Sequence, residues 1–96
     1  MNFSVKENKI IFTIDGDLNY QKAVAIKKII EKEEIKKVYI EFKCPKFVDT
    51  EGIRLLYSLW KKGFNITLKN PPDLFFEVVK ILKLEELLEN IEVVNG

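Results

Sequence analysis

Short runs of β-branched and aromatic residues alternate with segments of helical periodicity, and this alternation constrains the fold more than any other feature of the chain. The runs at 9–14, 38–42 and 64–69 predict strands. Between them, the segments 20–33 and 49–62 repeat apolar residues at helical spacing and carry charged residues on the other side. Strands that alternate with helices predict an α/β fold, in which a mostly parallel sheet packs against helices.

The two ends of the chain add shorter elements. Residues 3–6 predict a first strand, which turns at Glu7-Asn8 into the strand at 9–14. The C-terminal part predicts a third helix over 75–82, a short fourth helix over 84–88 and an edge strand over 91–94. The predicted order is therefore β-β-α-β-α-β-α-α-β. Because the apolar run from Ile10 to Ile14 is nearly continuous, we expect that strand to be buried on both faces.

Local signals place the starts of the two long helices. Asn19 directly precedes the first helical segment and is a suitable N-cap. Asp49 and Thr50 are both suitable caps for the second helix, and Glu51 lies favourably in its first turn. Each helix is thus expected to begin directly after a short loop that follows a strand.

Length and composition limit the classes of function. The 96 residues suffice for one domain, 1–96, and the net charge is +1 with basic and acidic residues interleaved. We therefore expect no nucleic-acid partner and no membrane association, since no apolar run approaches the roughly 20 residues of a spanning helix. Residues 1–6 lack the apolar core of a signal peptide, and the single cysteine, Cys44, favours a reducing compartment. The expected location is cytoplasmic.

Enzyme chemistry is constrained by the residue types present. The chain has no histidine, which is the commonest general base and zinc ligand, and its 4 glycines are scattered and form no phosphate-binding loop. Lysine and carboxylate catalysis remain open, but no pattern selects them. We therefore expect a protein that is not itself an enzyme and needs no cofactor.

Three segments carry a resemblance to a known family. Phe47-Val48-Asp49-Thr50-Glu51-Gly52-Ile53 has an apolar pair, an aspartate, a hydroxyl residue, a variable residue and a glycine at the start of a helix. Ile14-Asp15-Gly16-Asp17-Leu18 and Leu68-Lys69-Asn70-Pro71 match in order. The chain thereby resembles the STAS domain family, of the anti-sigma-factor-antagonist type, over nearly its whole length. This resemblance implies a STAS-like single domain with a four- or five-stranded mixed sheet and helices packed mainly on one face.

The resemblance also implies a function. In that family the hydroxyl residue after the aspartate is phosphorylated, and it corresponds here to Thr50, with Asp49, Glu51 and Gly52 as supporting residues. The unphosphorylated antagonist binds a serine/threonine kinase that is also the anti-sigma factor, and this binding releases the sigma factor. The kinase then phosphorylates the antagonist, which dissociates, and a phosphatase resets it.

The expected partner-binding surface combines two loops and one helix face. Its residues are Asp17, Asn19, Lys46 and Arg54. Arg54 departs from the family pattern, which often has a small residue there, and its position allows pairing with a phosphate on Thr50, four residues away. We expect Phe47 and Val48 to point into the core as an anchor that holds Thr50 at the surface.

Other interpretations stay open at the level of sequence. Thr50 is also explained as an ordinary helix N-cap. A STAS-like chain can serve as a scaffold or transport-complex subunit whose Thr50 is never phosphorylated. A small enzyme or ligand carrier is the third possibility, although the chain has no polar cluster that points to it.

Overall fold

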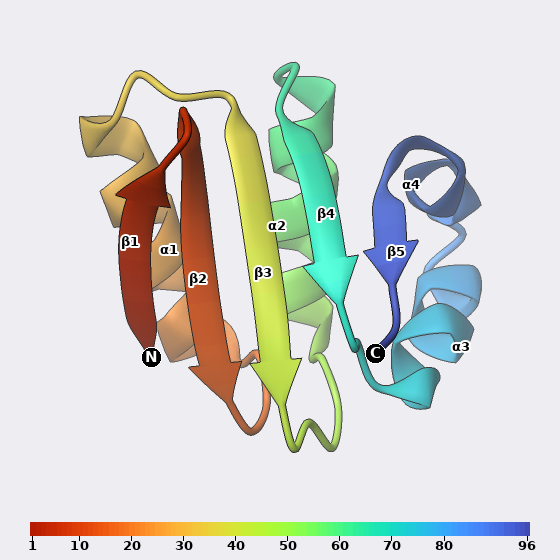
Figure 1. Cartoon of the computed structure of the whole chain (residues 1–96). Helices are drawn as coiled ribbons and strands as arrows, with labels where there is room; N and C mark the ends of the chain where they lie inside the picture. Colours follow the sequence, from red (N-terminus) through yellow and green to blue (C-terminus); the bar gives the residue numbers. More distant parts are fainter.

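Five strands form one sheet in the order β1-β2-β3-β4-β5, and four helices pack against it (Figure 1). The computed structural model describes residues 1–96. The elements are β1 (Asn2–Lys6), β2 (Lys9–Asp15), α1 (Tyr20–Lys32), β3 (Lys37–Lys43), α2 (Thr50–Lys61), β4 (Asn65–Lys69), α3 (Asp73–Ile81), α4 (Glu85–Asn90) and β5 (Glu92–Val94). The order predicted from the sequence is confirmed, with boundaries that differ by one or two residues at most element ends.

The sheet is mixed in the predicted way. Strand β1 pairs with β2 in antiparallel fashion, whereas β2, β3, β4 and β5 are parallel neighbours. Helices connect the parallel strands, and all four helices lie on the same face of the sheet (Figure 1). The predicted α/β class and the one-sided packing of the helices are therefore confirmed.

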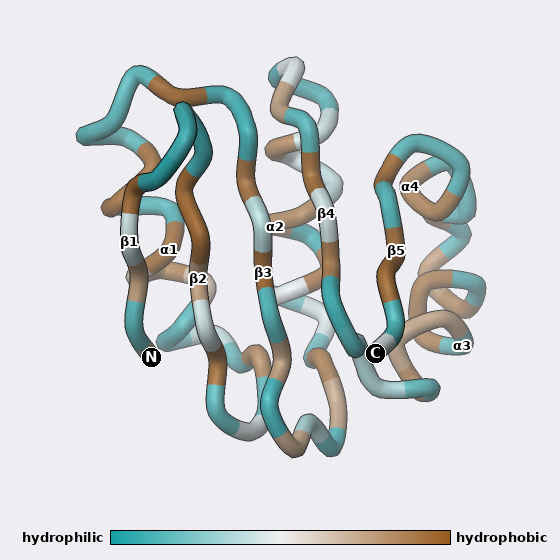
Figure 2. The backbone as a smooth tube through the Cα atoms, viewed as in Figure 1, coloured by the Kyte–Doolittle hydropathy of each residue, from teal (hydrophilic) through white to brown (hydrophobic).

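The prediction that the second strand is buried on both faces is wrong. In β2, Ile10, Phe12 and Ile14 are fully buried, whereas Ile11 and Thr13 between them are only half-buried. The reason is that no helix covers the second face of the sheet, so alternate side chains of each strand meet solvent. In Figure 2 the same alternation of apolar and polar positions is visible along β3 and β4.

The core lies between the sheet and the helices. Twenty buried apolar residues form one continuous cluster. Helix α2 contributes Ile53, Leu55, Leu56 and Leu59 to it, more than any other helix, and lies between α1 and the C-terminal helices. The position of α2 is thus determined by packing on both sides, and so is the position of its first turn.

No helix of the structure combines the length and the apolar character needed to cross a membrane. The longest, α1, has 13 residues.

Candidate functional site

The two long helices begin side by side at the carboxyl end of β2 and β3. Leu18, before α1, forms an isolated parallel bridge with Val48, before α2. The amide of Asp49 donates to the carbonyl oxygen of Leu18 at 3.1 Å. The loops that contain residues 15–19 and 44–49 are therefore held together, although they lie about thirty positions apart in the sequence.

The carboxylate of Asp17 makes a second connection between these loops. Its Oδ1 accepts hydrogen bonds from the amides of Lys46 and Phe47, both at 2.9 Å. The Phe47 amide, the Lys46 amide and the positive charges of Lys46 and Lys22 hold the pKa of Asp17 below its ordinary value of 3.8. Asp17 was expected to contact a partner, and the structure gives it a role in organising the loop that carries the candidate site.

Lys22, in the first turn of α1, holds the loop of residues 15–19 through its side chain. Its Nζ donates to the carbonyl oxygens of Asp15 at 2.7 Å and Asp17 at 2.8 Å. Gly16 between them adopts a positive φ of 77°, and its amide donates to the carbonyl oxygen of Lys43 at 2.9 Å. Sequence reasoning missed Lys22, because a lysine on a charged helix gives no sign of which carbonyl groups it will reach.

Both helices have side-chain N-caps. Asn19 Oδ1 accepts from the Lys22 amide at 2.9 Å, which confirms Asn19 as the N-cap of α1. Asp49 Oδ1 accepts from the Gly52 amide at 3.0 Å and is the N-cap of α2. Of the two cap candidates in the sequence, the structure thus selects Asp49. Thr50 is the first helical residue, and capping does not explain its hydroxyl group.

Gly52 has a steric reason to be glycine. A Cβ atom at this position would lie 2.9 Å from Cγ of Leu18 and 3.0 Å from Cγ1 of Val48. Those two residues form the bridge between the loops, and both are buried. The first turn of α2 can therefore rest on the bridge only if residue 52 has no side chain.

Thr50 is exposed, as expected, but only one of the two residues predicted to anchor it, Val48, points into the core. Val48 is 1% exposed and packs in the core, whereas Phe47 is 40% exposed. The prediction that Phe47 points inward is wrong, because neighbouring residues of an extended segment point to opposite sides and Val48 takes the inner one. Phe47 is thereby an apolar side chain at the surface, three positions from Thr50.

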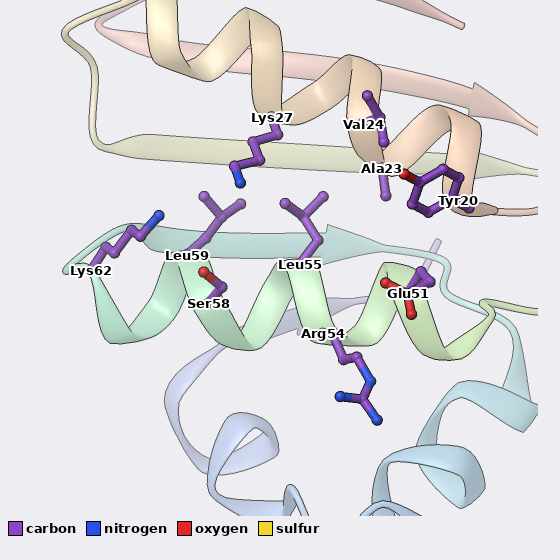
Figure 3. Close-up of a pocket in the computed structure, with 10 residues that line it drawn as sticks. All are labelled: Tyr20, Ala23, Val24, Lys27, Glu51, Arg54, Leu55, Ser58, Leu59 and Lys62. Carbon is purple, nitrogen blue, oxygen red and sulfur yellow. The ribbon is translucent and has the colours of Figure 1, made fainter.

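A groove between α1 and α2 begins next to the first turn of α2 (Figure 3). It has a volume of about 310 Å³, with apolar side chains of both helices at its base. Lys27 and Lys62 reach toward each other from the two helices at the end far from Glu51, while the Arg54 side chain points away from both lysines (Figure 3). Tyr20, at the start of α1, is 60% exposed beside the near end.

The remaining predicted site residues fall into two groups. Glu51, Arg54 and Lys46 are exposed and available to a partner. Asn19 and Asp49 are half-buried, and their side chains are used as helix caps. Sequence reasoning missed the exposure of the aromatic residues Tyr20 and Phe47. No local signal in the sequence distinguishes either of them from a core residue.

Comparisons with known proteins give a match at the level of structure. No family model matches the sequence, and no curated protein matches it significantly. A crystal structure from Thermotoga maritima, described as that of a "putative anti-sigma factor antagonist", superposes with a TM-score of 0.70. The superposition covers 99% of this chain and 86% of the other, at 16% sequence identity. The chain shares the fold of that protein. At this identity the agreement concerns the arrangement of strands and helices, and the roles of single residues depend on the geometry described above.

Proposed function

We propose that this chain is a protein-binding switch of the anti-sigma-factor-antagonist type, controlled by phosphorylation of Thr50. The observation that carries the proposal is the placement of Thr50: an exposed hydroxyl residue at the first position of a helix whose cap is supplied by its neighbour. The loop that presents it is fixed to the rest of the fold by the Leu18–Val48 bridge and by Asp17. A rigid, exposed acceptor of this kind suits recognition by a kinase.

The electrostatics of the first turn favour a phosphate there. The first amides of a helix lack intrahelical acceptors, and the helix dipole places partial positive charge at this end. A phosphate on Thr50 would add a charge of about −1.5 to −2. This charge would be tolerated within the free chain, yet it would have to be desolvated in any contact that covers the first turn of α2.

The surroundings of Thr50 support a protein partner. Phe47 and Tyr20 are 40% and 60% exposed, and they offer apolar contact area near an otherwise charged surface. Lys46 and Arg54 add exposed positive charge. In the proposed cycle an anti-sigma factor that is also a serine/threonine kinase binds this surface, in the cytoplasm, and thereby releases its sigma factor. A phosphatase returns the chain to the binding form.

The chain acts in this cycle as the substrate of the kinase and not as a catalyst. Thr50 supplies the hydroxyl that attacks the γ-phosphate, while the base and the magnesium ions belong to the kinase. Asp49 assists by holding the first turn through its hydrogen bond to the Gly52 amide. Arg54 lies one helical turn after Thr50, and this spacing supports pairing of its guanidinium group with the phosphate once it has formed.

The decisive experiment is phosphotransfer followed by a binding measurement. Purified protein is incubated with ATP and candidate anti-sigma factor kinases, and the modified residue is identified by mass spectrometry. We expect one phosphate on Thr50, loss of modification in Thr50→Ala, and normal modification in Ser58→Ala, a matched hydroxyl variant on the same helix. Phosphorylated protein should bind the kinase more weakly than unmodified protein.

Two results would contradict the proposal. Modification that persists in Thr50→Ala would place the acceptor elsewhere. Tight binding to a partner protein without any phosphotransfer would instead indicate a scaffold or transport-complex subunit on the same fold.

A further inference from the structure

The outer edge of β1 is an unprotected sheet edge. All five residues of β1 are exposed, and the strand pairs with β2 on one side only. Phe3 is 49% exposed and Val5 is 47% exposed, which is unusual for large apolar side chains in a strand. The sole charged residue of β1, Lys6, lies at its end next to the turn. Sheet edges in monomeric proteins are usually short, charged or covered, and β1 has none of these protections along residues 2–5.

The opposite edge of the sheet is protected. Strand β5 has only three residues, and two of them are half-buried. The chain after it continues beside the end of β4: the Asn70 backbone amide donates to the carbonyl oxygen of Val94 at 2.8 Å, and Asn70 Oδ1 accepts from the Gly96 amide at 2.9 Å. Helices α3 and α4 lie next to β5 (Figure 1). The exposure of β1 is therefore a property of that edge and not of the whole sheet.

The turn between β1 and β2 determines which backbone groups of β1 face outward. Glu7 and Asn8 both have positive φ, at 53° and 63°, which is the conformation of a two-residue type I′ turn. In such a turn Lys6 and Lys9 form a hydrogen-bonded pair, and bonded and non-bonded pairs alternate from there along the ladder. Ser4 therefore bonds to β2, while the amide and carbonyl groups of Phe3 and Val5 point away from the sheet.

The pattern of β1 is self-complementary about Ser4. When two copies pair in antiparallel fashion with Ser4 opposite Ser4, Phe3 of each copy lies opposite Val5 of the other. The outward amide and carbonyl groups of these two residues then meet as hydrogen-bonded pairs. Lys6 lies opposite Asn2, so no like charges face each other.

The same pairing brings apolar side chains together on the helix side of the sheet. Phe3 and Val5 share the face of Phe12 and Ile10, their partners in β2, and the rings of Phe3 and Phe12 lie 6.1 Å apart. Ile10 and Phe12 are fully buried in the core, so Phe3 and Val5 continue its apolar surface outward to the edge of the sheet. A second copy would cover Phe3 and Val5 with the same two residues of its own strand.

We propose that the protein forms a two-fold symmetric dimer by antiparallel pairing of its β1 strands, which joins two five-stranded sheets into one of ten. The partner that suits this edge is a second copy of the chain. Under the two-fold operation the outward hydrogen-bonding groups meet, Phe3 and Val5 pair with each other, and no like charges face each other. This inference is independent of phosphorylation at Thr50, because it uses the β1 edge of the sheet, which α1 separates from α2 (Figure 1).

The first test uses the wild-type protein alone. Sedimentation velocity from micromolar to millimolar concentration should show a monomer that converts to a dimer. Amide exchange followed by NMR should show protection of Phe3 and Val5 that rises with concentration, while Ser4 is protected at every concentration by β2. A monomer at all concentrations, or a dimer in which Phe3 and Val5 stay unprotected, would overturn the proposal.

The second test uses variants that keep the hairpin. Val5→Pro removes an outward amide without removing a hydrogen bond to β2, so it should stay folded and monomeric. Val5→Thr, which keeps the amide and the β-branched shape, is the matched control and should still dimerise. The double variant Phe3→Lys/Val5→Lys should be monomeric because lysines face each other, whereas Phe3→Glu/Val5→Lys should dimerise because each pair is then opposite in charge. Equal dimerisation of both double variants would contradict the proposed register.

Discussion

At the scale of single residues, the start of α2 depends on side chains that meet across two loops. Leu18 and Val48 form the surface on which the first turn of the helix rests, and Gly52 is the residue that touches it. Asp17 holds the second loop through two backbone amides, and Asp49 caps the helix. Val48 and Gly52 are buried at this contact, and Thr50 between them lies on the exposed side of the first turn.

Gly52→Ala should destabilise the protein, although alanine is the better helix former. In an exposed helix this replacement would stabilise by about 0.5–1 kcal/mol. Here the new Cβ would lie 2.9 Å from buried Leu18, so the bridge between the loops must shift. We expect a net loss of about 1–3 kcal/mol in the free energy of unfolding, measured by urea denaturation. A stabilised Gly52→Ala variant would show that the close contact is easily relieved; Ser58→Ala, on the same helix, is the control for alanine itself.

Asp17 should make the stability of the fold depend on pH in the acid range. Its pKa in the folded chain lies below 3.8 because the amides of Phe47 and Lys46 donate to the ionised form. Its contribution is therefore fully present above the ordinary pKa and is lost as the pH falls through the lowered folded value. The difference in unfolding free energy between wild type and Asp17→Asn should thus be larger at pH 7 than at pH 2.

A matched variant isolates the hydrogen bonds of Asp17 from its charge. Asp15 is exposed and its side chain makes no hydrogen bond in the structure, so Asp15→Asn removes a charge alone. At pH 7 it should differ little from wild type. If Asp17→Asn and Asp15→Asn were equally stable at pH 7, the two amide hydrogen bonds would contribute nothing measurable.

At the scale of strands and helices, periodicity predicted the order of the elements because each element signals its type locally. Apolar residues at helical spacing in α1 and a β-branched run in β3 are readable without the rest of the chain. The same local signal could not show that only one face of the sheet is covered. Ile10 and Ile11 are both isoleucine, yet only Ile10 is fully buried, since burial depends on where the helices pack.

The candidate site shows the same division between local and long-range information. The cap at Asn19 and the exposed Thr50 follow from residues close in sequence and were predicted. The contacts of Asp17 with Lys46 and Phe47 span 29 and 30 positions, and no local pattern indicates them. Phe47 was expected in the core as part of the anchor for Thr50, but Val48 alone is buried there and Phe47 is 40% exposed.

The turn between β1 and β2 should accept a stabilising replacement. Glu7 and Asn8 both adopt the left-handed conformation, which costs a residue with a Cβ atom roughly 1–2 kcal/mol. Asn8→Gly removes this cost at the second position, where type I′ turns prefer glycine. We expect the free energy of unfolding to rise by about 0.5–1 kcal/mol, seen as a higher melting temperature. No stabilisation in Asn8→Gly would argue against a type I′ turn. It would then also argue against the outward direction of the backbone amide and carbonyl groups of Phe3 and Val5.

At the scale of the whole molecule, three surfaces differ in character. The first turn of α2 presents Thr50, and the β1 edge is the proposed contact with a second copy. The uncovered face of the sheet is formed by alternate strand positions, most of which are polar. Because α1 lies between the β1 edge and α2, which begins at Thr50, a dimer through β1 leaves both copies of Thr50 accessible (Figure 1). Partner binding and self-association should therefore vary independently, and Val5→Pro should bind the kinase as tightly as wild type.

The switch itself should separate stability from affinity. Because Asp49 and not Thr50 is the cap of α2, Thr50→Ala should change the free energy of unfolding by less than about 0.5 kcal/mol and leave partner binding intact. Thr50→Glu places negative charge at a helix N-terminus, where the dipole favours it, so the fold should be no less stable. The same charge must be desolvated in the contact with the anti-sigma factor, and binding should weaken by about 1–3 kcal/mol. Melting temperatures and calorimetric affinities of both variants measure the two effects separately. If Thr50→Glu binds as tightly as wild type, the first turn of α2 lies outside the interface, and a phosphate on Thr50 cannot control binding.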